Sequence, residues 1–237
     1  MSGPVADVQG VLGGMKTCVV VPVHNEALFI GRVVGELKEK GFEVVVVDDG
    51  SHDGSGGVAK EKGAVVLSHE KRKGKGSSLR DGFRYAVEHG FDGVVAMDGD
   101  GQHAIEDVDA FIKKARESPD CVIVGSRMKN PKGMPFVRFL TNKIMSFLIS
   151  LLCRQTIDDT QCGFRFIGTK VLKEINLSSS DYEIESEVLI KATKKGFRIF
   201  SVPIQTIYSH ECSKINPLTD TVRFFRYILR EAWNSKP

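Results

Sequence analysis

The chain has little of what marks disulfide-rich, zinc-binding or nucleic-acid-binding proteins. Only 5 of its 237 residues are cysteine, an odd number, and no two of them form a CxxC pair. We therefore expect neither a disulfide framework nor a zinc site, and this cysteine usage fits a reducing cytoplasm. The net charge is +3 and the sequence pI is about 8.5. That charge is too small to indicate a nucleic-acid partner.

Long hydrophobic runs are also missing. No stretch reaches 18 uninterrupted apolar residues, so no segment is expected to span a bilayer. The first 15 residues are rich in glycine and lack the pattern of a signal peptide, so we expect a flexible segment there. The most apolar segment, Phe136–Cys153, is interrupted by polar residues such as Arg138 and Lys143. We favour a helix packed in the core, and a helix lying partly on a membrane surface stays open.

The sequence does contain a regular alternation of short valine-rich and helical segments. Strands are expected at 17–23, 42–47, 64–67, 91–97 and 121–125, and helices at 25–40, 53–62, 77–89 and 106–117. Asn25 is the expected N-cap of the first helix. Residues 168–195 read as two helical pieces and 196–208 as a strand. This order predicts a single α/β domain over 16–237, with an open, mostly parallel central sheet flanked by helices.

The tail, Asp220–Trp233, has the pattern of a basic amphipathic helix. A helix that caps the core and a helix that contacts an anionic membrane are equally open.

Polar clusters follow three of the expected strands. His24, Asn25 and Glu26 come after the first, Asp48 and Asp49 after the second, and DGDG, residues 98–101, after the fourth. Ligands of open parallel sheets bind outside the carboxyl ends of the strands. We therefore expect these clusters to form one site.

Residues 94–103, VVAMDGDGQH, carry the sharpest chemical signal. A buried strand would end at two carboxylates, Asp98 and Asp100. At about 4 Å and an effective dielectric near 20 they would repel by roughly 4 kcal/mol, so a cation is expected between them. With Gln102 they offer only oxygen donors, which suit Mg²⁺ or Mn²⁺ bridged to a substrate diphosphate. A solvated acidic loop is the alternative.

Other patterns are weaker. The GKGSS stretch from Gly74 lacks the first glycine of a phosphate-binding loop, because His69 stands there. It is expected to supply backbone groups and Lys75 to a nucleotide, with Arg80 one turn into the helix, although a solvated basic loop is equally open. Apart from His24 and His103, the histidines are expected at the surface. The cysteines are expected to be buried and unreactive.

Six stretches occur together in one order: VVVPVHNE (19–26), VVVDDGSHDGS (45–55), KGKGSSLRDG (73–82), MDGDGQH (97–103), GSR (125–127) and DTQCGFR (159–165). On these motifs the chain resembles family 2 glycosyltransferases with the GT-A fold (the nucleotide-diphospho-sugar transferase fold). Among these it is similar to the enzymes that move a sugar from a nucleotide onto a polyprenyl phosphate, such as dolichyl-phosphate mannose and glucose synthases. The Gln-x-x-Arg-Trp motif of processive members is missing, which favours a single transfer.

The resemblance implies a role for each matching residue. The implied nucleotide site contains Pro22, His24, Asn25, Glu26, Asp48, Asp49, Lys75, Arg80 and Asp98. Within it, Glu26 is expected near the ribose and Asp49 at the base, with Asp48 in support. Asp98, Asp100 and Gln102 would bind the metal ion, and Arg127 and Arg138 the acceptor phosphate. Asp98, Asp100, Arg127 and Arg165 form the implied catalytic set, with Arg165 near the sugar or the phosphates.

The function expected from this resemblance is a metal-dependent, inverting transfer of one hexose from UDP-glucose or GDP-mannose to a dolichyl or undecaprenyl phosphate. The enzyme would be peripheral at the cytosolic face of a membrane, alone, as a homo-oligomer or with a membrane-anchoring partner. One alternative is transfer to a hydroxyl of a soluble saccharide or protein, for which Asp159 or Glu185 would be the base. The other is a nucleotide-sugar sensor without turnover.

Overall fold

The computed structural model describes residues 14–128, 131 and 133–205. The predicted flexible segment, apart from residues 14 and 15, and the predicted tail helix Asp220–Trp233 lie outside these ranges.

The described ranges contain one seven-stranded sheet in the order β3-β2-β1-β4-β6-β5-β7. The strands are β1 (Thr17–Val23), β2 (Glu43–Asp48), β3 (Val65–Ser68), β4 (Gly93–Ala96), β5 (Cys121–Ser126), β6 (Arg165–Gly168) and β7 (Arg198–Pro203). All neighbours pair in parallel except β6, which is antiparallel to β4 and to β5. The expected open, mostly parallel sheet is confirmed.

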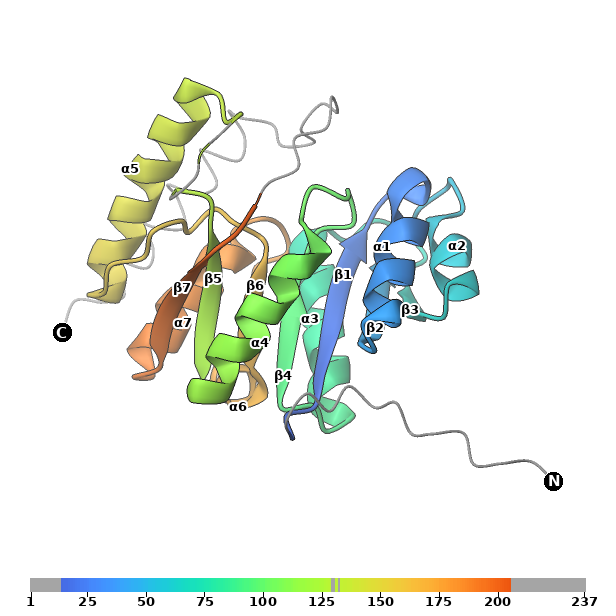
Figure 1. Ribbon diagram of the computed structural model, residues 1–237, viewed down its shortest axis with the longest axis horizontal. Coiled ribbons are helices and arrows are strands. Elements are labelled where there is room, and N and C mark those ends of the chain that lie inside the picture. Colours follow the sequence, from blue (N-terminus) through green and yellow to red (C-terminus); the bar gives the residue numbers. More distant parts are fainter. Residues whose placement is uncertain (1–13, 129–130, 132, 206–237) are drawn as a thin grey trace.

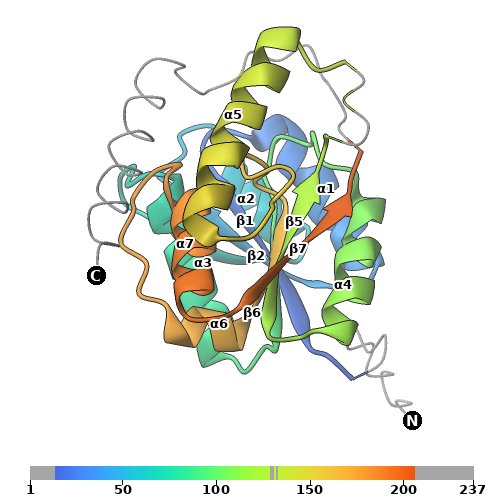
Figure 2. The same ribbon diagram turned by 90° about the vertical axis from the view of Figure 1, so that its left-hand side faces the viewer.

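The helices are α1 (Ala27–Glu39), α2 (Ser55–Glu61), α3 (Lys75–Glu88), α4 (Val108–Glu117), α5 (Phe136–Cys153), α6 (Thr169–Glu174) and α7 (Ile184–Lys194). Figure 2 shows α1 and α4 on one face of the sheet and α3, α6 and α7 on the other. Helix α5 packs on α7 at the outer end of the sheet, beside β7 (Figure 1).

The central strands are buried on both faces, which explains their valine-rich sequences. Val19, Val20 and Val21 of β1 and residues 44–47 of β2 have no exposed surface. Burying each such side chain contributes about 1.5 kcal/mol to folding. These strands fix the ends from which the polar clusters emerge.

One strand was not predicted, and one local expectation was wrong. Strand β6 has only four residues, too few for a periodic pattern to be visible in the sequence. Helix α1 has Glu26 rather than Asn25 as its N-cap. Asn25 instead takes a positive φ of 56°, a conformation that asparagine tolerates better than most residues. Its Oδ1 accepts a hydrogen bond from the backbone N–H of His52 at 2.9 Å.

Helix α5 presents an apolar face outward. Its inner side buries Asn142, Ser146, Ile149 and Cys153. Six large apolar side chains on the rest of the helix, which we call the α5 stripe, are 47–75% exposed: Phe136, Val137, Leu140, Ile144, Phe147 and Leu151. By length and composition alone α5 meets the criteria for a membrane-crossing helix, and 22% of it is buried. The expectation of a core helix therefore holds only for its inner side.

Candidate functional site

The polar clusters come together at the carboxyl edge of the sheet, as expected. Val23 at the end of β1 pairs with Asp48 of β2, and Asp48 pairs with Ser68 of β3. The loop after β1 is tied to the loop after β2 by side-chain hydrogen bonds. The His24 Nδ1 lies 2.8 Å from the carbonyl oxygen of Asp49, and the Glu26 N–H donates to Ser55 Oγ at 2.8 Å.

Asp48 and Pro22 support these loops. Pro22 is half-buried in β1, where it pairs with Val47. One carboxylate oxygen of Asp48 accepts from the Ser51 N–H at 2.9 Å. A side chain at Gly56 would come within 2.5 Å of the other oxygen. Asp48 thus needs a glycine beside it.

Asp49 holds the loop that leads into α3. Its carboxylate is 4% exposed and accepts hydrogen bonds from the N–H groups of Lys73 and Gly74 at 2.7 and 2.8 Å. The His69 Nδ1 is a third partner at 2.8 Å. Burial alone would raise the pKa of Asp49, but these three hydrogen bonds hold it below its usual range. Contact of Asp49 with a base stays a prediction.

His69 is buried, contrary to the expectation of a surface position. Its Nε2 lies 2.8 Å from Asp81 of α3, and its side chain is only 5% exposed. Each ring nitrogen lies within hydrogen-bond distance of a carboxylate oxygen. This pairing joins the β2 end to α3, and no local pattern around His69 indicated it.

Asp98 and Asp100 lie at the end of β4, and Lys75 is the cation beside Asp98. The Lys75 Nζ lies 2.5 Å from Asp98 Oδ1 and 2.8 Å from Glu185 Oε1. Burial opposes both charges, yet the attraction between them lowers the pKa of Asp98 and raises that of Lys75. Lys75 therefore lies beside Asp98, and Glu185 of α7 joins them. Contact of Lys75 with a nucleotide stays a prediction.

Two further residues border Asp98. The His103 Nε2 lies 3.6 Å from Asp98 Oδ2, and its ring packs on Phe164 with centroids 4.8 Å apart. A Cβ added at Gly163 would meet Asp98 Oδ2 at 2.8 Å and Lys75 Nζ at 3.1 Å. A side chain in place of the glycine in DTQCGFR would therefore displace the ends of the ion-paired side chains.

Asp100 has less positive charge beside it than Asp98 has. Burial and the charge of Asp98 raise the pKa of Asp100. Its Oδ1 accepts a hydrogen bond from the Gln102 N–H at 3.0 Å. Among the described residues, no group of three or more His, Cys, Asp and Glu side chains is arranged to hold a metal ion. Mg²⁺ needs only one or two carboxylates when water and substrate phosphate complete its shell, so this donor set fits it.

The arginines are more buried than their implied roles suggest. Arg127 donates to Asp159 from Nε at 2.7 Å and from Nη2 at 2.9 Å, and Asp159 has no exposed surface. Arg165 is 2% exposed and donates to the carbonyl oxygens of Glu185 and Cys162 at 2.6 and 2.5 Å. Both side chains hold the 159–165 loop, and their contact with substrate stays a prediction.

Two implied residues lie outside this cluster. The Arg80 guanidinium contacts the carbonyl oxygens of Leu177 and Ser178 at 3.5 and 3.4 Å, so it fastens α3 to the segment before α7. Arg138 is half-buried in the first turn of α5. The structure therefore does not bring Arg138 into the ion-pair network of Asp98.

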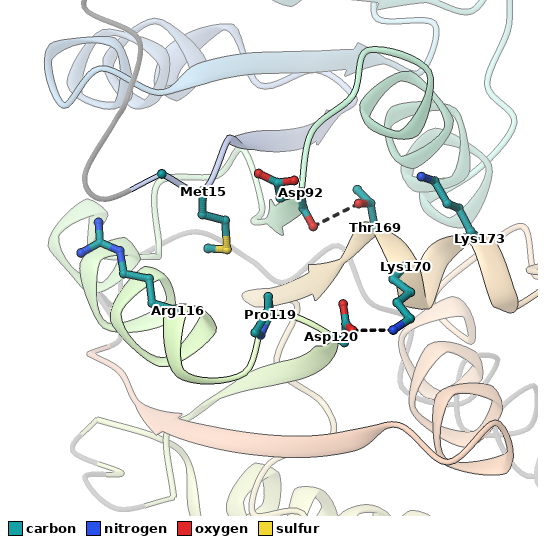
Figure 3. Close-up of a pocket in the computed structure, with 9 residues that line it drawn as sticks. Met15, Asp92, Arg116, Pro119, Asp120, Thr169, Lys170 and Lys173 are labelled. Atoms are coloured by element: carbon teal, nitrogen blue, oxygen red, sulfur yellow. Dashed lines mark hydrogen bonds and ion pairs between the residues drawn. The ribbon is translucent and has the colours of Figure 1, made fainter.

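A cavity of about 710 Å³ lies where the chain enters β1 and β5, away from the polar clusters described above (Figure 3). Lys170 pairs with Asp120 at its wall, at 2.6 Å. It contains none of the motif residues, so it is not the predicted site.

Comparison with known proteins agrees with this geometry. A family model described as glycosyl transferase family 2 matches residues 18–175. The chain is 33% identical over 214 residues to a UDP-N-acetylglucosamine–dolichyl-phosphate N-acetylglucosaminyltransferase of Methanococcus voltae, covering 81% of this chain and 85% of that protein. It is 29% identical over 205 residues to a polyprenol monophosphomannose synthase of Mycolicibacterium smegmatis, covering 80% and 76%.

Among solved structures, a glucosyl-3-phosphoglycerate synthase of Mycobacterium tuberculosis, in complex with Mn²⁺, UDP and glucosyl-3-phosphoglycerate, has a TM-score of 0.68. The identity is 16%, and the alignment covers 99% of this chain and 84% of that one. At this identity the likeness shows the fold, and it confirms the expected GT-A architecture. The family match covers well over half of the chain, and its motifs meet at one edge of the sheet: this chain belongs to glycosyltransferase family 2.

Proposed function

We propose that the protein transfers one hexose from a UDP- or GDP-sugar to a polyprenyl phosphate, with inversion and with a divalent metal ion, at the cytosolic face of a membrane. One relative is named for transfer to dolichyl phosphate and another for the synthesis of polyprenol monophosphomannose, which supports this acceptor. The observation that carries the metal-dependent chemistry is the carboxylate pair at the end of β4. There burial and the charge of Asp98 raise the pKa of Asp100.

Asp98, Asp100 and the side-chain oxygen of Gln102 would hold the ion, which would act as a Lewis acid toward the departing diphosphate. Lys75, already beside Asp98, would add a positive charge near the same leaving group. An acceptor phosphate is largely ionised at neutral pH, because its second pKa is near 6. It can attack the anomeric carbon directly, so this acceptor requires no dedicated base.

The cationic groups for the acceptor are assigned differently from the sequence-based expectation. Arg127 is held by Asp159 through two side-chain hydrogen bonds. We therefore assign it the positioning of the 159–165 loop. Arg138 lies in the first turn of α5 and its side chain is half-buried. Its guanidinium is the better candidate for binding a lipid phosphate, because an arginine fork matches phosphate geometry.

The α5 stripe supports a membrane-bound acceptor. Its exposed residues recur every three or four positions, so they form one apolar face along the helix. The inner side is held to the protein, because Ser146 Oγ accepts a hydrogen bond from the Thr160 N–H at 2.9 Å, next to Asp159. A helix bound in this way can rest on a bilayer without leaving the protein, which favours peripheral contact over spanning.

The alternative acceptor, a hydroxyl group, is less favoured by the geometry. It would need a base, and both candidates are engaged: Asp159 is fully buried against Arg127, and Glu185 is paired with Lys75.

A transfer assay tests the proposal. Labelled UDP-glucose, UDP-N-acetylglucosamine and GDP-mannose are each incubated with undecaprenyl phosphate in detergent, with Mn²⁺ or with EDTA. We expect one donor to give a labelled lipid phosphate of inverted anomeric configuration, with no product in EDTA or with undecaprenol in place of its phosphate. Asp100→Ala should lose both product and metal-linked nucleotide binding.

Transfer to a soluble hydroxyl acceptor, with none to the lipid phosphate, would contradict the proposal. Metal-dependent binding of a nucleotide sugar without transfer to any acceptor would instead identify a sensor.

A further inference from the structure

Lys75 lies between two acidic partners supplied by distant parts of the chain. Its Nζ is 2.5 Å from Asp98 at the end of β4 and 2.8 Å from Glu185 of α7. The Lys75 side chain is 17% exposed, and its Nζ lies 5.5 Å from the centre of the Tyr182 ring. The ammonium group therefore occupies an enclosed place beside one oxygen of a proposed metal ligand.

A divalent ion and an ammonium group on the same carboxylate repel each other. The Lys75 side chain is 17% exposed and that of Asp98 is 32% exposed, so this partial burial reduces screening by water. Glu185 gives Lys75 a second anion, so the lysine can leave Asp98 without losing every ionic partner.

The backbone next to Lys75 is held in place by neighbouring residues, so only the Lys75 side chain is able to move. The Ser77 N–H donates to the Ser180 carbonyl oxygen at 3.1 Å. A Cβ at Gly76 would lie 2.6 Å from the Ser179 carbonyl oxygen. The turn that begins α3 is thus clamped by the segment before α7. An exchange of partners at Asp98 would therefore require rotation of the Lys75 side chain toward Glu185.

We propose that Lys75 and the divalent ion compete for Asp98, and that Glu185 receives the Lys75 ammonium when the ion binds. This inference rests on the proposed function, because it assumes that Asp98 is a metal ligand. A nucleoside diphosphate brings further anionic oxygens to Lys75, so it favours the displaced position. Metal and nucleotide binding are therefore cooperative, and Lys75 carries that coupling.

The test measures free Mn²⁺ by electron paramagnetic resonance during titration of the protein, without nucleotide and with saturating UDP or GDP. Lys75→Met should bind Mn²⁺ about tenfold more tightly than the unmodified chain without nucleotide, because the competing cation is gone. In that variant the nucleotide should raise Mn²⁺ affinity by a smaller factor than in the unmodified chain. Lys73→Met is the matched control, because its exposed side chain lies two residues away, and it should leave the Mn²⁺ affinity unchanged.

Glu185→Gln is a second variant, and it should change the Mn²⁺ affinity in the opposite direction from Lys75→Met. It leaves Asp98 as the principal anion of Lys75, so Mn²⁺ affinity without nucleotide should fall severalfold. Circular dichroism melts establish that each variant is folded, and Glu185→Gln decides the question if Lys75→Met does not fold.

Equal Mn²⁺ affinity in the unmodified chain and in Lys75→Met, or weaker binding by Lys75→Met, overturns the competition while leaving the proposed transfer intact. If the unmodified chain binds no Mn²⁺ with either nucleotide, the inference fails together with the metal dependence of the proposed function.

Discussion

At the scale of residues, Asp98 and Asp100 are two positions apart, yet the pKa of Asp98 is lowered and that of Asp100 is raised. Burial disfavours the charge of both carboxylates. The Lys75 ammonium beside Asp98 outweighs burial and lowers its pKa, whereas the negative charge of Asp98 adds to burial and raises the pKa of Asp100. The same residue type therefore gives one strongly paired carboxylate and one that still favours a cation.

Asp49→Asn should make folding less stable in a pH-dependent way. The pKa of Asp49 is lowered in the folded state, so its ionised form stabilises the fold above the unfolded value near 4, and this contribution is lost as the pH falls through the folded pKa. We expect a loss of about 3 kcal/mol at pH 7 that shrinks below about pH 4. Urea unfolding at several pH values measures it.

Asp120→Asn is the matched control for Asp49→Asn. Asp120 pairs with Lys170, and the two side chains are 48% and 63% exposed. Its loss should cost less than about 0.5 kcal/mol. Equal effects of the two substitutions at pH 7 would contradict the role given to Asp49.

Arg127→Ala should destabilise the protein as well as impair transfer, because it leaves the fully buried Asp159 without its guanidinium partner. We expect a cost of about 3 kcal/mol, and Arg127→Ala with Asp159→Ala should cost less than the sum of the two single changes. Denaturant unfolding of the four proteins completes the cycle. Strict additivity would show that the pair is not coupled.

At the scale of elements, α5 and the turn that begins α3 each pack against the rest of the protein through one side. The α5 stripe faces outward while Ser146 and Asn142 face the protein. The turn at Gly74–Gly76 lies directly against residues 179–181. Secondary-structure propensity explains neither the exposed apolar residues of α5 nor the glycines at positions 74 and 76.

Ile144→Glu with Phe147→Glu should reduce sedimentation with anionic lipid vesicles at least about tenfold, because two apolar contacts are replaced by like charges. Stability should change by less than about 1 kcal/mol, since both residues are surface residues. Leu28→Glu is the matched control, because Leu28 is 87% exposed on α1 and lies outside the stripe. Unchanged vesicle binding of the double variant would remove α5 from the proposed membrane contact.

Gly76→Ala should disrupt the protein locally, whereas Gly35→Ala should stabilise its fold. The Cβ of the first would lie 2.6–2.7 Å from backbone atoms of residues 179–181, so the turn must shift and nucleotide binding should be lost. Gly35 lies within α1 with nothing within 4 Å of its would-be Cβ, and alanine there should stabilise the fold by about 0.5–1 kcal/mol. Thermal melts with and without nucleotide distinguish the two.

At the scale of the whole molecule, the fold buries the four cysteines of the described ranges at separate places: Cys18 on β1, Cys121 on β5, Cys153 at the end of α5 and Cys162 in the loop before β6. Burial raises the pKa of Cys18, Cys121 and Cys162 to about 12. At pH 8 the thiolate form of these groups is therefore scarce.

In a Cys212→Ser variant, no thiol should react with a disulfide reagent at pH 8 until the protein unfolds. The labelling rate should rise with urea in parallel with global unfolding, because exposing these buried side chains requires the core to open. Mass spectrometry identifies the labelled residue. Rapid labelling of any of the four in the absence of urea would contradict the burial of that side chain.

The sequence by itself determined the first five strands, the polar clusters at the carboxyl ends of three of them, and the family. These follow from local patterns: valine runs predict buried strands, and a strand end places its next residues at the sheet edge. Tertiary structure alone decided the antiparallel β6, the outward α5 stripe and the pairing of Lys75 with Glu185, 110 residues away in the chain. The physical reason is that a charge or an apolar face is assigned its partner by folding, and a linear pattern contains no information about which distant residue will neutralise or cover it.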